Sequence, residues 1–126
     1  MSAAGLLAVG LGAALGAWLR WLLAILLNPV LPTLPLGTLA ANLVGGFLVG
    51  VAVAAFADRT EIPQVWRLFI ITGFLGGLTT FSTFSAESVA LLMRGSYAWA
   101  FAHAGAHLFG SLALTALGIA TYRAFA

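Results

Sequence analysis

The segment Gly73–Ser85, GFLGGLTTFSTFS, concentrates groups able to bind an ion. Three glycines precede a seven-residue stretch made only of five hydroxyl side chains and two phenylalanines. A hydroxyl can donate a hydrogen bond, and the positive edge of a phenylalanine ring attracts an anion. If the helix unwinds at Gly76-Gly77, carbonyl oxygens lose their partners and become ligands for a small hard cation. The segment therefore predicts a site for a small ion, held without a full counter-charge.

Structural roles compete for the same side chains. Serine and threonine hydroxyls in membrane helices often bond to the carbonyl one turn earlier, and phenylalanines often face lipid. One such residue would fit these roles, but five hydroxyls directly after Gly76-Gly77 favour a functional surface. At about 100° per residue, Phe81, Phe84, Ser85 and Ser88 fall within one arc of roughly 100°.

Two further polar residues lie inside apolar segments. A charge at the centre of a membrane span costs about 2.5–3.5 kcal/mol. Arg20 therefore either extends to the interface beside Trp18 and Trp21 or attracts anions to an aqueous vestibule. Asn42 lies one helical turn from Thr38, and its amide either bonds to a neighbouring helix or donates to a bound species.

The last apolar segment carries a polar stripe at four-residue spacing: His103, His107, Ser111 and Thr115. Two histidines at i and i+4 can bind a metal, but the sequence offers no evident third ligand. A polar lining or packing contacts are therefore favoured. Glu87 lies just past the hydroxyl-rich segment and either lines a vestibule or pairs with an arginine.

The elements that must position these residues are membrane helices. The chain has 126 residues, of which 63% are hydrophobic and 6% charged, whereas a soluble domain has roughly 45–50% and 25%. The strict alternation of membrane strands is absent. We predict an all-α membrane protein with a single domain, residues 1–126, and a break in its third helix. Four apolar segments, each near the ~20 residues of a membrane span, are expected at about Ala4–Leu27, Pro35–Ala57, Trp66–Met93 and Tyr97–Tyr122.

The flanking charges and small residues suggest how these helices insert and pack. Arg59, Arg67 and Arg123 fall on the side of the termini, and Arg94 falls opposite, joined by Arg20 if that residue extends outward. Such a thin bias permits insertion in both orientations. Glycine or alanine pairs at four-residue spacing indicate close helix packing, as in Gly12-x-x-x-Gly16, Gly46-x-x-x-Gly50, Gly73-x-x-x-Gly77 and Ala106-x-x-x-Gly110.

Composition also excludes several functions. With no cysteine, the chain can form no disulfide or thiolate metal site. Five arginines are too few for a nucleic-acid footprint. The N-terminus has no basic region before its apolar run, so we expect it to be the first span and not a secretory signal peptide.

In GFLGGLTTFSTFS, and in the stretches Gly12–Arg20 and Gly37–Gly45, the chain resembles the Fluc (CrcB) family of bacterial fluoride channels. The resemblance covers essentially the whole chain and is weakest in the fourth helix. It implies a channel that exports fluoride passively across the bacterial plasma (inner) membrane. It also implies an antiparallel, dual-topology homodimer with two separate pores, in contact with lipid and with fluoride.

The resemblance further implies roles for individual residues. Phe81 and Phe84 would contact fluoride through their ring edges, Asn42 would be the pore-side amide, and Arg20 the vestibule arginine. Hydroxyls along the pathway would come from Thr38, Ser82, Thr83, Ser85 and Ser111.

A structural sodium ion at the dimer centre would be held by the backbone carbonyls of Gly76 and Thr79. His103 and His107 correspond to no family motif and could alter the pH dependence.

Other functions fit less well. A small drug or cation antiporter needs a carboxylate deep in the membrane. Here the first helix carries Arg20 and no acidic residue, and Glu87 lies beyond the break in the third helix. A scaffold protein would explain the glycines but not the hydroxyl and phenylalanine cluster. An enzyme is not expected, because no nucleophile–base pair or metal triad can be assembled from the sequence.

Overall fold

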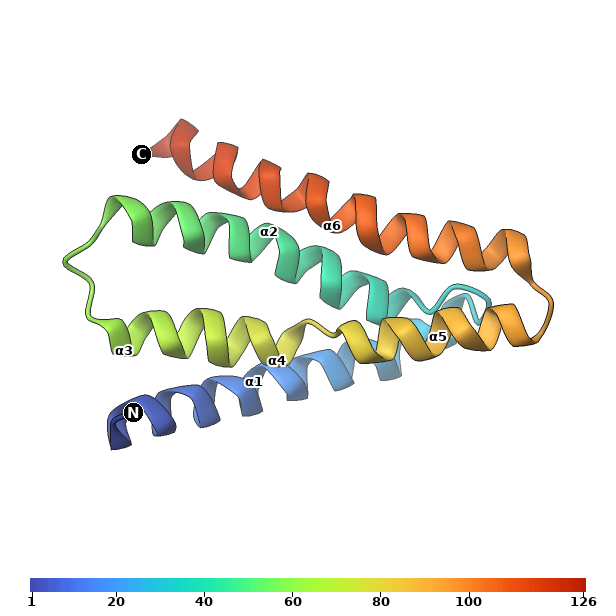
Figure 1. The fold of residues 1–126 in the computed structure, drawn as a ribbon, viewed down its shortest axis with the longest axis horizontal. Coiled ribbons are helices and arrows are strands. Elements are labelled where there is room, and N and C mark those ends of the chain that lie inside the picture. Colours follow the sequence, from blue (N-terminus) through green and yellow to red (C-terminus); the bar gives the residue numbers. More distant parts are fainter.

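The computed structural model describes residues 1–126 and contains helices and connecting loops but no strand (Figure 1). Four stretches are long and apolar enough to cross a membrane, so the predicted all-helical fold with four spans is confirmed. The first is α1, Ala3–Leu27, followed by the short 3₁₀ turn η1, Asn28–Val30. The second is α2, Leu36–Asp58, and the fourth is α6, Tyr97–Phe125.

The third span is divided into several helical pieces. It begins with α3, Gln64–Arg67, continues as the π-helical stretch η2, Leu68–Leu75, and then as α4, Gly76–Leu78. After a break it resumes as α5, Phe81–Met93. Both termini and the loop between α2 and α3 lie at one end of the bundle (Figure 1).

The predicted break in the third span is present, but its position differs from the one expected. The residues with extended backbone are Thr79 (φ −88°, ψ 153°) and Thr80 (φ −148°, ψ 122°), whereas Gly76 and Gly77 remain helical. A Cβ atom on Gly77 would collide with the backbone of Ala13 in α1. Gly77 therefore serves close packing of α4 against α1, and the unwinding begins two residues later.

The glycines at four-residue spacing form the contacts between spans. A Cβ atom on Gly16 in α1 would collide with the carbonyl of Phe74 in η2. A Cβ atom on Gly50 in α2 would collide with the carbonyl of Thr115 in α6. The small residues let these backbones touch, which confirms the prediction that they mediate packing.

Candidate ion-binding site at the helix break

The side chain of Asn42 replaces the backbone partners that Thr80 loses at the break. The Thr80 N–H donates to Asn42 Oδ1 over 2.8 Å, and Asn42 Nδ2 donates to the Thr80 carbonyl over 3.0 Å. These two bonds fix which end of the amide faces Thr80. The second hydrogen of Nδ2 then points to His107 Nδ1, 3.0 Å away. Of the two roles considered for Asn42, the helix-to-helix bond is present.

Arg20 replaces the lost backbone donor of Gly77. In an unbroken helix the Gly77 carbonyl would accept from the N–H of residue 81. Here it accepts from Arg20 Nε at 2.9 Å. Arg20 is half-buried, and its bond to Gly77 places it beside α4. Neither of the two roles predicted for Arg20 included this contact. Its guanidinium covers a carbonyl exposed by the break.

The side chains of Thr79 and Thr80 also bond to backbone groups on either side of the break. The N–H and the hydroxyl of Thr79 both donate to the Leu75 carbonyl, over 3.0 Å and 2.8 Å. Thr80 is the N-cap of α5, because its Oγ1 accepts from the Thr83 N–H at 3.1 Å. The donors of Thr79 are thus satisfied on one side of the break, and α5 is capped on the other.

Two carbonyls at the break lose their helical donors. In a continuous helix, Gly76 would accept from Thr80, and Thr79 would accept from Thr83. The Thr80 N–H goes to Asn42 instead, and the Thr83 N–H goes to the Thr80 hydroxyl. The carbonyl oxygens of Gly76 and Thr79 are therefore available to a cation or to another donor.

An open groove of about 670 Å³ runs beside the break, between α2, the third span and α6. Its polar lining includes Asn42, Thr79, Thr80, His107 and Ser111. Phe81 and Phe84 contribute aromatic rings to the same lining, and the carbonyl-bearing Gly76 also borders it. The structure thus brings together in one groove many of the residues predicted to bind ions.

The two phenylalanines differ in how they are held. Phe81 is 79% exposed, and its ring centre lies 5.5 Å from that of Phe84. The Phe84 ring stacks nearly parallel to His103 at 5.3 Å and lies 4.9 Å from His107. Phe84 is therefore fixed by α6, whereas Phe81 is free to meet a neighbour across the groove.

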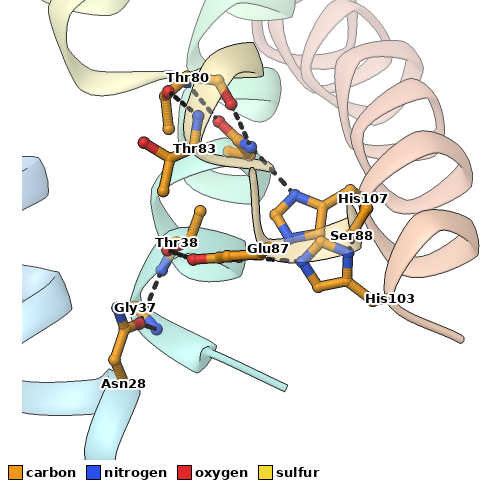
Figure 2. Close-up of polar contacts among 10 residues, drawn as sticks. Asn28, Gly37, Thr38, Thr80, Thr83, Glu87, Ser88, His103 and His107 are labelled. Atoms are coloured by element: carbon orange, nitrogen blue, oxygen red, sulfur yellow. Dashed lines mark hydrogen bonds and ion pairs between the residues drawn. The ribbon is translucent and has the colours of Figure 1, made fainter. Parts of the chain in front are cut away.

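Glu87 lies at the centre of a network that joins α2, α5 and α6 (Figure 2). Its Oε2 accepts from the Thr38 hydroxyl at 2.6 Å, and its Oε1 lies 2.9 Å from His103 Nε2. The Ser88 hydroxyl lies 2.9 Å from His103 Nδ1. Glu87 pairs with a histidine and a threonine, so the alternative in which it pairs with an arginine is wrong.

Asn28 positions the α2 end of this network. Its Oδ1 accepts from the backbone N–H groups of Gly37, at 2.7 Å, and Thr38, at 3.1 Å (Figure 2). Pro35, the N-cap residue of α2, provides no side-chain cap, so Asn28 supplies it from the preceding turn. Apart from the Asn28-Pro29 turn, no sequence pattern indicated this role.

The remaining predicted residues occupy different environments. The Ser82 side chain is exposed and lies 3.3 Å from the Thr80 hydroxyl. Thr83 and Ser85 are half-buried on α5, and Ser111 borders the groove. Thr115, from the polar stripe, donates to the Gly46 carbonyl at 2.9 Å and so joins α6 to α2.

The fold defines a multi-pass membrane protein whose third span is interrupted beside a groove, an arrangement that membrane proteins tolerate only where the irregular backbone is buried or lines a cavity. The sequence matches the family described as CrcB-like protein, Camphor Resistance (CrcB), over residues 7–119. The chain belongs to this family, as the resemblance in its motifs predicted.

Three curated relatives are similar to this chain over nearly all of its length. A protein of Ralstonia pickettii is 64% identical over 125 residues, covering 99% of both chains. One of Cupriavidus metallidurans is 59% identical over 126 residues, covering both chains completely. One of Nitrosospira multiformis is 63% identical over 118 residues, covering 94% of this chain and 92% of the relative. Each is named "Fluoride-specific ion channel FluC". The expectation that the chain is not an enzyme is confirmed by this family membership.

Replacing Asn42 with Leu should destabilise the fold, because the N–H and carbonyl of Thr80 would lose their partners at membrane depth. Each unsatisfied buried group costs about 1–3 kcal/mol. The thermal unfolding midpoint of the purified protein measures this loss. Thr115→Val is the matched control, since it removes one side-chain bond but leaves the continuous helix α2 intact. Equal midpoints for the two variants would show that Asn42 does not support the break.

Proposed function

We propose that the chain is a fluoride-selective channel that conducts passively across the bacterial plasma membrane and so lowers cytoplasmic fluoride. The observation that carries this proposal is the groove at the helix break, where Phe81, Phe84 and several hydroxyls lie together. The two relatives that match over 99–100% of the chain are each named a fluoride-specific ion channel, which supports the same ion.

The chemistry of the groove suits a small anion that must also leave quickly. Helix α5 begins at Phe81, so its first N–H groups lack intrahelical partners and form the positive end of a helix dipole. The ring edges of Phe81 and Phe84 add further positive potential. No arginine lines the groove, and Arg20 already bonds to Gly77. A fluoride ion would therefore meet several partial charges and no full one.

Hydroxyls extend this pathway. Ser82, Thr83 and Ser85 follow along α5, and Ser111 faces the groove from α6. Thr38 lies further along, where it bonds to Glu87. We infer that these side chains replace part of the hydration shell of fluoride as it passes, and that Asn42 contributes through the Thr80 backbone that it holds.

A second, antiparallel copy of the chain is the partner that the groove requires. In lipid, the carbonyls of Gly76 and Thr79, whose helical donors are diverted, and the Ser111 hydroxyl beside the groove cannot face hydrocarbon without partners. A symmetric copy would cover them and leave a polar passage along each side. The arginine distribution permits dual topology, because the excess of Arg59, Arg67 and Arg123 at one end over Arg94 at the other is a thin bias.

We also propose that a structural sodium ion lies at the centre of this dimer. The carbonyls of Gly76 and Thr79 fit such an ion, because their helical donors are diverted to Asn42 and Thr80. Hard cations prefer oxygen ligands, and two copies would supply four such carbonyls. The ion would join the copies at the point where both third spans are broken.

Phe84→Ile and Phe81→Ile should each slow fluoride efflux from liposomes by at least ~10-fold, equal to about 1.4 kcal/mol in the barrier. Isoleucine preserves bulk but has no positive ring edge. Phe101→Ile is the control, since that exposed ring lies outside the groove. Efflux is driven by a potassium gradient with valinomycin, and chloride is measured in parallel. Undiminished fluoride efflux in both variants would remove the rings from the pathway. Chloride release equal to that of fluoride would contradict selectivity.

A protease-cleavable tag after Ala126 should be accessible on about half of the molecules in sealed vesicles, because the thin arginine bias permits both orientations. Thr60→Arg adds a charge to the exposed loop at the end of the termini and should shift the cleaved fraction toward one orientation. Complete cleavage or complete protection of the parent chain would exclude dual topology.

Replacing sodium with N-methyl-D-glucamine should lower the fraction of dimer, measured by single-molecule photobleaching in liposomes. The cause would be repulsion among carbonyls that no longer share a cation. Potassium substitution serves as the control for ionic strength. An identical dimer fraction and identical fluoride efflux in all three salts would refute the sodium assignment.

A further inference from the structure

Glu87, His103 and His107 place three potential metal ligands close together inside the bundle. One ligand atom from each side chain lies within 4.8 Å of the other two. His103 and His107 are buried, and the Glu87 side chain is 16% exposed. The sequence showed the two histidines without a third ligand. The structure adds Glu87 from α5, which faces them across the contact between α5 and α6 (Figure 2).

A second observation independently points to a missing partner. His107 Nε2 is buried and forms no hydrogen bond. Because Asn42 Nδ2 donates to His107 Nδ1, the proton of the neutral ring lies on Nε2. An unpaired buried donor of this kind costs about 1–3 kcal/mol. A ligand that engages Nε2 would remove this cost.

We propose that Glu87, His103 and His107 form a binding site for a first-row divalent transition metal such as Zn²⁺, and that the bound metal slows ion passage. Two imidazole nitrogens and one carboxylate are a known ligand set for zinc, with a fourth position left open. Magnesium and calcium prefer oxygen ligands alone, so they are not expected here. The part of the proposal that concerns passage rests on the proposed channel function.

The network needs only limited rearrangement to accept the metal. Zinc bonds of about 2.0–2.1 Å place tetrahedral ligand atoms about 3.4 Å apart, somewhat closer than their present limit of 4.8 Å. Thr38 bonds to Glu87 Oε2, which leaves Oε1 for the metal once it separates from His103. The contacts that now hold Glu87 therefore also orient it as a ligand.

The positions of the ring protons of His103 and His107 determine which hydrogen bonds a bound metal would break. Ligation through Nε2 moves the proton of each neutral histidine to Nδ1. At His103 the Ser88 hydroxyl can turn and accept that proton. At His107 the facing group is Asn42 Nδ2, a donor held in place by Thr80, so this contact must break. Metal binding would therefore act on the amide that supports the helix break.

The open fourth position also bears on conduction. His107 and Phe84 both border the groove, and Phe84 contacts both histidine rings. A divalent charge here would hold a passing anion more strongly than the partial charges of the groove do. Slower exit and a disturbed Asn42 contact both predict reduced flux with metal bound.

Binding is tested first, on the purified protein in detergent, by the visible absorption of added Co²⁺ and its displacement by Zn²⁺. We expect one saturable site per subunit. His103→Gln, His107→Gln and Glu87→Gln should each weaken binding by at least ~10-fold, whereas Glu61→Gln, in an exposed loop, should not. Gel-filtration profiles confirm that each variant is folded. Absent saturable binding in the parent, or unchanged binding in all three folded variants, would overturn the site.

Flux is tested second, by fluoride efflux from liposomes with and without Zn²⁺. We expect at least ~10-fold slower efflux for the parent and for Glu61→Gln, corresponding to about 1.4 kcal/mol. A folded variant that has lost Co²⁺ binding should show no response to Zn²⁺. Binding without any change in efflux would refute the effect on passage while preserving the site. Absence of metal-free efflux in the parent would instead refute the channel function, which the absorption measurement does not depend on.

Discussion

The extended backbone at Thr79 and Thr80 is the constraint on which the rest of the structure depends. At membrane depth no water is available to satisfy exposed N–H and C=O groups, so an interrupted helix needs other donors and acceptors. Asn42 provides both for Thr80, and Arg20 provides a donor for Gly77. The two polar side chains that looked anomalous in their apolar segments are thus what makes the break possible.

The break places two helix ends of opposite polarity beside one groove. Carbonyls of the preceding segment, at Gly76 and Thr79, lose their donors, and α5 begins with unpaired N–H groups at Phe81. A single interruption can therefore serve a cation through the carbonyls and an anion through the helix start. Arg20 lowers the negative potential at the carbonyl end, because its guanidinium bonds to the Gly77 carbonyl.

Much of this could be predicted from the sequence. The four spans follow from apolar length, and the interruption follows from the glycines and hydroxyls of GFLGGLTTFSTFS. The position of the break could not be predicted, because Gly76 and Gly77 look like the weak point when α1 is not considered. Contact with Ala13 holds Gly77 in a helix, so the unwinding falls on two threonines whose bonding depends on other spans. Local propensity was overridden by packing between helices.

Contacts between residues on different helices also could not be predicted from the sequence. Glu87 and His103 are separated by a turn, and only the way α5 packs on α6 brings their side chains to 2.9 Å. Spacing along one helix relates His103 to His107 but reveals nothing about the helix that faces them. The same limit hid Asn28, whose side chain caps α2 across a loop.

His107 connects the two polar regions of the molecule. Through Nδ1 it bonds to the amide that holds the break, and its unpaired Nε2 belongs to the Glu87 cluster. Because the Asn42 orientation is fixed by Thr80, the tautomer of His107 is fixed as well, and any ligand that requires the other tautomer must oppose the bonds at the break. The side chains of His107 and Asn42 thus connect the buried cluster to the Thr80 backbone by hydrogen bonds. The support of the interrupted span and the chemistry of the histidines are therefore one connected system.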